Sequence, residues 1–383
     1  MSYITTLFAL LSLLSVTHSP ITYANTKIII QVMSPDEYQP KVLRDSQGKV
    51  HQIYYKILDT LSGNGHLYYR QYNDKHANWS NAVQVSTQPY PLPGVLSPAK
   101  FTIDDDGRVH ATWLRHNPNA YMYTRSNIQG TRFEVERSLV SKHLDGFEVS
   151  SDLAVKGKEV TLTWMVGANE NARTVYTMTS LNGGQRFNEE KKLGDQRLGG
   201  CSCCGFTSRF NKMGKLIVAY RSAAHGDERH MQLLTGSDKK DSSDTQLIHR
   251  WNYSACPVST NHIAQSKEGD DWLTFETAGR IYIANLQKFP ISPILVSEPK
   301  QDIRQKYPEM SINDLGYKLV VWREGNGYAR HGISGMQLFS PDGSIDDINT
   351  ITKKQLPTKI NDISVTSLAD NSFLVVYQPY KDL

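Results

Sequence analysis

The feature of this sequence that most restricts its fold is a hairpin pattern that recurs seven times. Each copy has a short strand, a turn with Gly or Asn, and a second strand that ends on an aromatic residue, as in DSQGKVHQIYY from Asp45 and DDDGRVHATW from Asp104. Turn chemistry of this kind between Val, Ile and aromatic residues predicts β-hairpins. The turn residues, spaced 47 to 59 positions apart, are Gly48, Gly107, Gly157, Gly214, Gly269, Gly316 and Asn371.

A second motif follows the hairpin in three early copies. Ser180–Phe187 reads SLNGGQRF and fits the Asp-box pattern Ser-x-Asp-x-Gly-x-x-aromatic with Asn in place of Asp. Ser126–Phe133 keeps the Ser, Gly and aromatic positions, and Tyr72–Trp79 keeps the Asp and the Trp. A turn of this kind joins two outer strands and packs its aromatic side chain between sheets, so we expect a structural role for these residues.

Units of about 50 residues with four strands each, stacked around an axis, form a β-propeller. The sequence therefore predicts an all-β propeller of four-stranded blades, with seven blades preferred and six as the alternative. The last copy leaves room for only two strands, and Thr26–Met33 (TKIIIQVM) reads as a further outer strand. We expect this N-terminal strand to pair with the last blade, because closing the ring removes both exposed sheet edges.

The N-terminus predicts export. The apolar run LFALLSLLSV (Leu7–Val16) suits a signal-peptide core and is shorter than the roughly 20 residues of a membrane helix. Cleavage is expected after Ala24, which leaves residues 25–383 as one periplasmic or secreted propeller domain without a membrane span. The 42 Lys and Arg residues are spread along the chain against 38 Asp and Glu, so we expect no nucleic-acid partner, and also no nucleotide cofactor.

Four cysteines carry the clearest chemical signal. Cys201, Cys203 and Cys204 lie in GGCSCCGF, and Cys256 lies in WNYSACPVS. Both segments directly precede a predicted innermost strand, in neighbouring blades, so they should meet at one mouth of the central channel. A bridge from Cys203 or Cys204 to Cys256 is sterically easy, whereas bridges among the first three residues would be strained.

The remaining thiols leave three interpretations open. Closely spaced thiolates favour soft metals, Cu(I) first and Zn(II) second, and His225, His230 or His262 could add an imidazole ligand. One or two disulfides that pin the loops would explain the cysteines equally well. A redox-active pair is the third interpretation.

The run GCSCCGFTSRFNKMGKLIVAYR, followed by GDERHMQL and later by WNYSACPVS, resembles bacterial sialidase-like propellers with BNR (Asp-box) repeats and a Cys-x-Cys-Cys motif. This resemblance implies the propeller fold for most of the chain and supports the cysteine site. It does not imply a particular reaction.

Sialidases bind the substrate carboxylate with arginines and use a Tyr nucleophile assisted by a Glu. The matching candidates here are Arg221 and Arg323, which each follow the second strand of a hairpin, together with Tyr307 and Glu324. The Arg-Ile-Pro motif expected in the first blade is replaced by Tyr38-Gln39-Pro40, which argues against sialidase activity.

Three functional hypotheses follow. The first is an exported propeller whose channel mouth carries a cysteine site for copper or zinc. The second is a glycan-binding or glycoside-hydrolase propeller of sialidase type. The third is a scaffold protein with purely structural cysteines.

Overall fold

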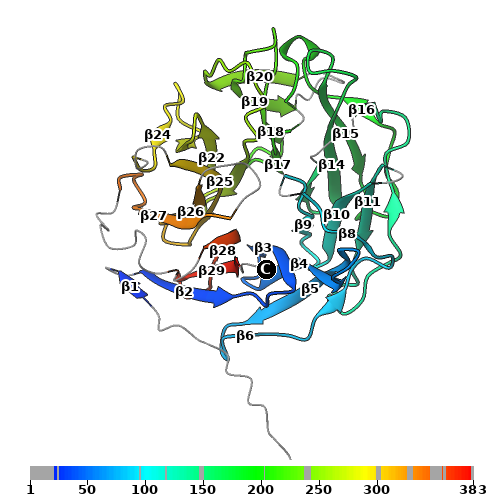
Figure 1. The fold of residues 1–383 in the computed structure, drawn as a ribbon, viewed down its shortest axis with the longest axis vertical. Helices are drawn as coiled ribbons and strands as arrows, with labels where there is room; N and C mark the ends of the chain where they lie inside the picture. The colour runs from blue at the N-terminus through cyan, green and yellow to red at the C-terminus, as the bar shows by residue number, and fades with distance from the viewer. Residues whose placement is uncertain are drawn as a thin grey trace, which may run out of the picture.

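The computed structural model describes residues 21–23, 26–94, 96–116, 119–145, 151–201, 203–236, 243–298, 303–325, 331–345, 356 and 359–380. These residues form seven sheets arranged radially around a central channel (Figure 1), which confirms the predicted seven-bladed β-propeller. In the described part of the chain, the 3₁₀ turn η1 (Gln196–Leu198) is the only helical element, and no helix is long and apolar enough to cross a membrane.

Each blade begins with a strand beside the channel. We number the blades from 1 to 7 by these innermost strands, which are β3 (Glu37–Arg44), β9 (Lys100–Ile103), β13 (Ser151–Lys156), β17 (Thr207–Phe210), β21 (Asn261–Gln265), β25 (Arg304–Ile312) and β28 (Ile360–Ser367). The second strands are β4 (Val50–Asp59), β10 (Val109–Arg115), β14 (Glu159–Val166), β18 (Leu216–Arg221), β22 (Asp271–Thr277), β26 (Lys318–Gly325) and β29 (Phe373–Pro379).

The outer half of each blade is less regular. The third strands are β5 (Asn64–Asn73), β11 (Ala120–Arg125), β15 (Thr174–Ser180), β19 (Met231–Gly236), β23 (Arg280–Asn285), β27 (Ile333–Phe339) and, in blade 7, β2 (Thr26–Val32). The outermost strands are β6 (Asn78–Trp79), β7 (Val83–Gln84), β8 (Tyr90–Pro91), β12 (Arg137–Ser138), β16 (Lys191–Lys192), β20 (Ser243–His249), β24 (Ile294–Leu295) and β1 (Ile21–Tyr23). Among the described residues blade 6 has three strands, and blade 1 pairs β6, β7 and β8 with the same strand, β5.

The turn residues explain why the hairpin repeat is readable in the sequence. Gly48, Gly107 and the four later glycines all have φ between 57° and 85°, and Asn371 has φ 66°. This left-handed region is open to Gly and is tolerated by Asn because of its short polar side chain. The turn between the first two strands of every blade therefore has one residue in the left-handed conformation.

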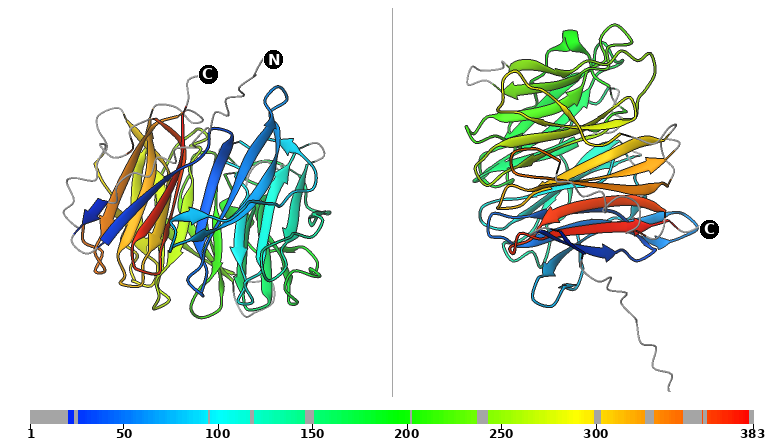
Figure 2. Two further views of the ribbon diagram at one scale, coloured as in Figure 1. Left: turned by 90° about the horizontal axis from the view of Figure 1, so that it is seen from below. Right: turned by 90° about the vertical axis from the view of Figure 1, so that its left-hand side faces the viewer.

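The ring closes as predicted. Strand β2 pairs with β29 in parallel, with Ile28 opposite Phe373 and Val32 opposite Tyr377. Figure 2 shows the dark-blue strand lying along the red strands of blade 7. Both β2 and β29 thereby gain a hydrogen-bonded neighbour on each side, since β1 covers β2 and β28 covers β29. The predicted signal peptide falls mostly outside the described residues, and its cleavage stays a prediction.

Apolar side chains fill the spaces between blades. Seven clusters of buried hydrophobic residues each combine strands of two adjacent blades, one cluster for each of the seven interfaces. The second motif contributes to this packing, because Phe187 of blade 3 meets Tyr123 of blade 2 and Phe133 of blade 2 meets Tyr69 of blade 1, both edge to face. Its role is structural, as expected. The central channel, in contrast, is lined largely by polar and charged side chains.

Candidate functional site

A polar pocket lies in the central channel, at the end where the innermost strands begin. Its lining follows the repeat: residues seven positions before a turn residue include Lys41, Lys100, His262 and Glu309. Residues nine positions before the turn also line it, namely Gln39, Pro98, Gly205, Thr260, Tyr307 and Asp362. Both positions lie within or just before the innermost strands, so the repeat brings equivalent residues to the same end of the channel.

An ion pair crosses the channel. Lys41 Nζ on β3 donates to Glu309 Oε1 on β25, although blade 7 lies between their blades. Ser364 of β28 donates to the second oxygen, Glu309 Oε2, at 2.6 Å. Burial alone would raise the pKa of Glu309, but Lys41, His262 and the hydrogen bond from Ser364 outweigh it, and the pKa lies below its ordinary value. Glu309 is therefore ionised near neutral pH.

A second carboxyl group in the pocket is shifted the other way. Burial raises the pKa of Asp362, and Arg323 and Lys41 offset only part of this effect. The pocket thus holds a carboxylate with a lowered pKa and a carboxylic acid with a raised pKa. Environments that separate two acids in this manner suit them to different roles in acid–base chemistry.

Two basic residues of the pocket are also perturbed by burial. The pKa of His262 is lowered to about 4, so its imidazole is neutral, and its Nδ1 accepts a hydrogen bond from the backbone N–H of Met310 at 3.4 Å. Burial lowers the pKa of Lys100, partly offset by Asp152 of the next blade. Asp152 in turn accepts a hydrogen bond from the backbone N–H of Ser208 at 2.6 Å.

Tyr307 and Arg323 form the aromatic side of the pocket. The guanidinium carbon of Arg323 lies 4.3 Å from the centre of the Tyr307 ring. Tyr307 has φ 56° and precedes Pro308, and Gln39 has the same unusual conformation, φ 52°, before Pro40 in blade 1. Positive φ at a non-glycine residue is rare and marks a position held by its surroundings. Both innermost strands bulge here, which turns these side chains into the pocket.

Of the four residues proposed by analogy with sialidases, Tyr307 and Arg323 line the pocket, whereas Glu324 and Arg221 do not. Burial raises the pKa of Tyr307 to about 12, and Arg323 opposes this shift. Arg323 and Glu324 are consecutive on β26 and leave the strand on opposite faces. Glu324 accepts hydrogen bonds from Trp322 Nε1 at 3.0 Å and from Gln305 Nε2 at 3.4 Å, within the blade. In the first blade, Gln39 donates to the backbone oxygen of Pro93 at 2.8 Å.

Arg221 lies away from the pocket and is occupied by protein partners. Its side chain is 1% exposed, and its guanidinium donates to Ser259 Oγ at 3.1 Å, to Thr277 Oγ1 at 3.3 Å and to the backbone oxygens of Arg229 and Glu276. Its own backbone oxygen accepts the N–H of Cys201 at 3.0 Å. Arg221 thus ties blades 4 and 5 together beneath the cysteine loop.

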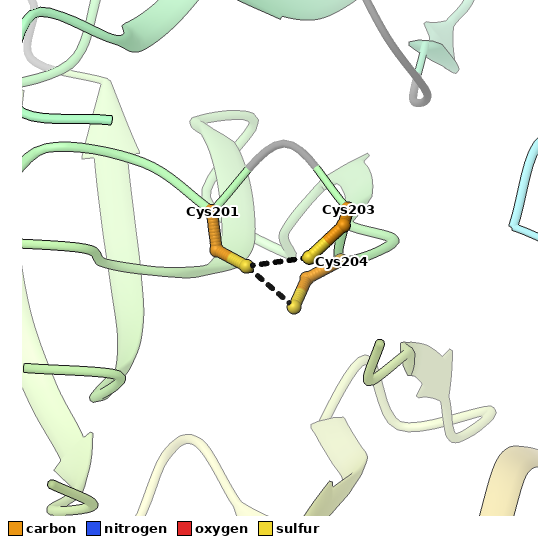
Figure 3. Close-up of side chains that lie close together, drawn as sticks. All are labelled: Cys201, Cys203 and Cys204. Atoms are coloured by element: carbon orange, nitrogen blue, oxygen red, sulfur yellow. Dashed lines mark hydrogen bonds between the residues drawn. The ribbon is translucent and has the colours of Figure 1, made fainter. Parts of the chain in front are cut away.

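The four cysteines lie close together in the segments that precede the innermost strands of blades 4 and 5. Cys203 is bonded to Cys256, with 6.6 Å between their Cα atoms. Cys201 Sγ lies 3.2 Å from Cys203 Sγ and 2.9 Å from Cys204 Sγ (Figure 3). Cys201 and Cys204 are 0% and 2% exposed, whereas Cys256 is at the surface. Of the two partners that the sequence left open for Cys256, the structure thus shows Cys203 and not Cys204.

Glycines let the cysteine loop lie against its neighbours. Gly199 has φ 58°, and a Cβ on Gly200 would lie 2.4 Å from the sulfur of Met165. The backbone N–H of Gly200 donates to the backbone oxygen of Glu170 at 2.9 Å. Arg229 donates to the Glu170 carboxylate at 2.8 Å and to the backbone oxygen of Ala255 at 3.3 Å. These hydrogen bonds connect the two segments that carry the cysteines.

The two unbridged thiols differ in acidity. Burial would raise the pKa of Cys204, but the Cys201 thiol, the Arg221 guanidinium and the backbone of Ser259 outweigh it, and the pKa is lowered. The hydrogen bond to Cys204 and burial together raise the pKa of Cys201. In the described structure the first proton to leave the pair comes from Cys204.

The candidate histidines do not join the sulfurs. His225 is exposed in a turn, and His262 belongs to the central pocket. His230 is buried, with Nδ1 3.2 Å from both the backbone nitrogen and the backbone oxygen of Trp251. Within the described residues, the side chains that gather three metal-ligating atoms within 4.8 Å are the cysteines 201, 203 and 204.

The sequence interpretation missed the channel residues Lys41, Lys100, Glu309 and Asp362. A signal for them was present, because they stand seven or nine positions before a turn residue in their hairpins. Aligning the seven copies on the turn would have shown charged residues recurring at one inward-facing position. The sequence did single out His262, but as a possible metal ligand beside the cysteines and not as a residue of the channel pocket.

Comparison with known proteins supports the fold. No protein-family model matches the chain, and no curated protein matches it in sequence. Among solved structures, the chain is similar to the α-L-arabinofuranosidase Arb93A of Fusarium graminearum, with a TM-score of 0.53 at 9% identity over 80% of this chain and 94% of that one. It is similar to the α-L-arabinanase of Penicillium chrysogenum, with a TM-score of 0.53 at 8% identity over 82% and 95% of the two chains.

The Trypanosoma rangeli sialidase gives a TM-score of 0.50 at 12% identity over 82% of this chain and 56% of that one. At these identities the likeness concerns the fold alone. The chain is thus a β-propeller with the architecture found in sialidases and arabinofuranosidases, and it carries a Cys-x-Cys-Cys motif beside its channel.

Proposed function

We propose that this chain is an exported propeller that binds a glycan at the central pocket, as in the second hypothesis above. The observation that carries the proposal is the pair of carboxyl groups, Glu309 and Asp362, whose pKa values are shifted in opposite directions within one pocket. Glycoside hydrolysis needs one carboxylic acid to protonate the leaving oxygen and one carboxylate to act as base or nucleophile. Similarity of fold to an arabinanase and a sialidase supports the same ligand class.

The charges of the pocket favour an acidic sugar. Three cationic side chains line the pocket, those of Lys41, Lys100 and Arg323. They face two carboxyl groups: Glu309 has a lowered pKa, and Asp362 has a raised pKa and retains its proton to higher pH. The enclosed volume is about 50 Å³, so a substituent of a terminal sugar, and not a whole glycan chain, would enter. A carboxylate is the substituent that these cations would recognise.

Calorimetric titration would test this proposal with three probes: sialyllactose, a galacturonic acid trimer and a neutral arabinotriose. We expect the acidic probes to bind more tightly than the neutral one and Lys100→Met to weaken them. Lys212→Met is the matched control, because Lys212 lies at the surface in an ion pair with Asp270. Equal loss in both variants, or no binding by any probe, would argue against a glycan pocket.

The cysteines support a second candidate function, binding of a soft metal. Three sulfurs lie within 4.8 Å of one another, and reduction of the Cys203–Cys256 bridge would add a fourth thiolate nearby. Such a donor set fits Cu(I) or Zn(II) in coordination number and softness. Titration of the reduced chain with Cu(I) against a chromophoric chelator should show one tight site that Cys201→Ser removes. Equal copper affinity in Cys201→Ser and the unmodified chain would exclude this site.

A further inference from the structure

The four cysteines are distributed unevenly with respect to solvent. The unbridged pair, Cys201 and Cys204, is buried, and the bridge between Cys203 and Cys256 reaches the surface through Cys256. A metal site would need that bridge to be open. The arrangement with the bridge closed places a buried dithiol directly against a surface disulfide.

From this geometry we propose that the cysteines form a thiol–disulfide relay, which passes an electron pair from the buried pair Cys201/Cys204 to the surface pair Cys203/Cys256. The proposal is independent of a glycan in the channel. It rests on the contacts of Cys201 Sγ with both other sulfurs, 2.9 Å from Cys204 Sγ and 3.2 Å from Cys203 Sγ.

The first step is attack of Cys201 Sγ on Cys203 Sγ, after the Cys201 proton has passed to the Cys204 thiolate 2.9 Å away. A Cys201–Cys203 bond forms, the Cys203–Cys256 bond breaks, and Cys256 leaves as a thiolate that takes up a proton at the surface. Thiol–disulfide exchange proceeds through such an attack of a thiolate on a disulfide sulfur. The departing sulfur is the exposed one.

The second step is attack of the Cys204 thiolate on Cys201 Sγ. A Cys201–Cys204 bond forms, the Cys201–Cys203 bond breaks, and Cys203 takes up the proton that Cys204 lost. Cys201 and Cys204 have the Cys-x-x-Cys spacing of disulfide oxidoreductase motifs, whose ring is less strained than that between closer cysteines. The chain still holds one disulfide and two thiols, but the thiols now include the exposed Cys256.

The surface pair can then reduce a disulfide of another molecule. The Cys256 thiolate attacks one partner sulfur and releases the other as a thiolate, and Cys203 then attacks Cys256 and releases the second partner thiol. Each chain delivers one electron pair and two protons, and ends with two disulfides. The partner class is therefore a peptide or low-mass disulfide.

A pocket beside Cys256 suits such a partner. Pro257, which follows Cys256, lines a pocket of about 210 Å³ together with Trp251, Tyr253, Arg304 and Lys306. The rings of Trp251 and Tyr253 are stacked with their centroids 5.1 Å apart. Aromatic faces and cations can hold the residues that flank a disulfide.

Alkylation of the native full chain, carrying two thiols and no added reductant, tests the relay directly. N-Ethylmaleimide is added, the chain is unfolded, and its disulfides are mapped by peptide mass spectrometry. We expect Cys203 and Cys256 to be labelled and Cys201–Cys204 to be bonded, because labelling traps the exchanged form. Recovery of an intact Cys203–Cys256 bond with Cys201 and Cys204 as the remaining thiols would overturn the relay.

Two variants separate the steps. Cys201→Ser should abolish labelling of Cys256, since it lacks the attacking sulfur. Cys204→Ser should stop the relay midway, so that Cys256 is labelled while Cys201–Cys203 stays bonded and Cys203 is not labelled. Each variant is compared with the unmodified chain by thermal melting, and a fold lost in one variant leaves the other to decide. Equal labelling of Cys256 in all three chains would contradict the proposed order.

The partner step is measured with oxidised glutathione as the probe. The unmodified chain should reduce one glutathione disulfide per chain and then stop, and Cys201→Ser should reduce none. Reduction by Cys201→Ser to the same extent as by the unmodified chain would show that the electrons do not pass through Cys201.

Discussion

Lys41 of blade 1 and Glu309 of blade 6 form an ion pair across the mouth of the channel, although 268 residues separate them in sequence. The strand that lies between their blades contributes Ser364 to the same carboxylate. Three blades are thus joined at one carboxyl group, beside the place where the ring closes. The ion pair therefore links the candidate ligand pocket to the integrity of the ring.

Removal of the charge of Glu309 should destabilise the fold. Glu309→Gln leaves Lys41 without its anion in a largely buried position, and we expect a loss of about 2 kcal/mol in the free energy of unfolding, below the value for a fully buried pair. The matched control is Asp270→Asn, which breaks the exposed pair with Lys212 and should cost roughly 0.5 kcal/mol. Urea denaturation measures both, and equal losses would contradict the structural role of the channel pair.

The two channel carboxyl groups should give stability profiles with opposite dependence on pH. Asp362 has a raised pKa in the folded chain, so the unmodified protein loses stability as the pH rises above about 3.8, and Asp362→Asn removes this loss. Glu309 has a lowered pKa, so its contribution is present above about 4.5 and disappears as the pH falls.

Melting temperatures between pH 3 and pH 7 should therefore diverge. Relative to the unmodified chain, Asp362→Asn should gain stability as the pH rises, and Glu309→Gln should lose it. Parallel profiles for the two variants would show that the pKa values of the two carboxyl groups are not shifted in opposite directions by folding.

Arg221 should act as a structural residue of the cysteine site. Arg221→Met removes hydrogen bonds to acceptors of blades 4 and 5, and we expect a loss of about 3 kcal/mol because bonds from a charged donor are among the stronger ones. The thiols of Cys201 and Cys204 should also react faster with Ellman's reagent. Arg197→Met is the control, since that side chain is 89% exposed. If the thiols of Arg221→Met reacted no faster than those of the unmodified chain, Arg221 would not hold the cysteine loop in place.

The closing strand should stabilise the whole ring and not only its own edge. Ile28 is 1% exposed and packs in the cluster between blades 6 and 7, so Ile28→Ala should cost roughly 2–4 kcal/mol. Val32→Ala, at a position 40% exposed on the same strand, is the matched control and should have little effect. Calorimetry should show one cooperative transition at a lower temperature for Ile28→Ala. An unchanged transition, or a wild-type melt after deletion of residues 26–33, would contradict the closure.

The fold could be predicted from the sequence because its turns require a particular residue type. A left-handed turn at Gly48 or Gly107 admits few alternatives to glycine, so the repeat stays visible where the strands themselves vary. The closing strand followed from counting, since the last hairpin lacked partners. Both inferences depend on local chemistry that recurs along the chain.

The candidate site was predictable only in part. The meeting of Cys256 with the Cys201–Cys204 loop followed from their equivalent places before neighbouring strands. The choice of Cys203 over Cys204 did not, because the directions of two adjacent side chains are set only once the loop is folded against Met165 and Ser259. Likewise, the sequence places His230 near the cysteines, but its ring is turned to the backbone of Trp251.

The parallel seam between β2 and β29 joins an N-terminal strand of blade 7 to the last strand of the chain. In a chain synthesised from its N-terminus, β2 is made early and must wait until the residues around Phe373 have followed. During that interval Ile28 and Ile30 lack the partner strand that covers them, and the blades already folded form an open arc with two uncovered ends. Exposure of such an arc to other unfolded chains should be the most vulnerable stage of folding, and it ends only when the C-terminal hairpin has been made.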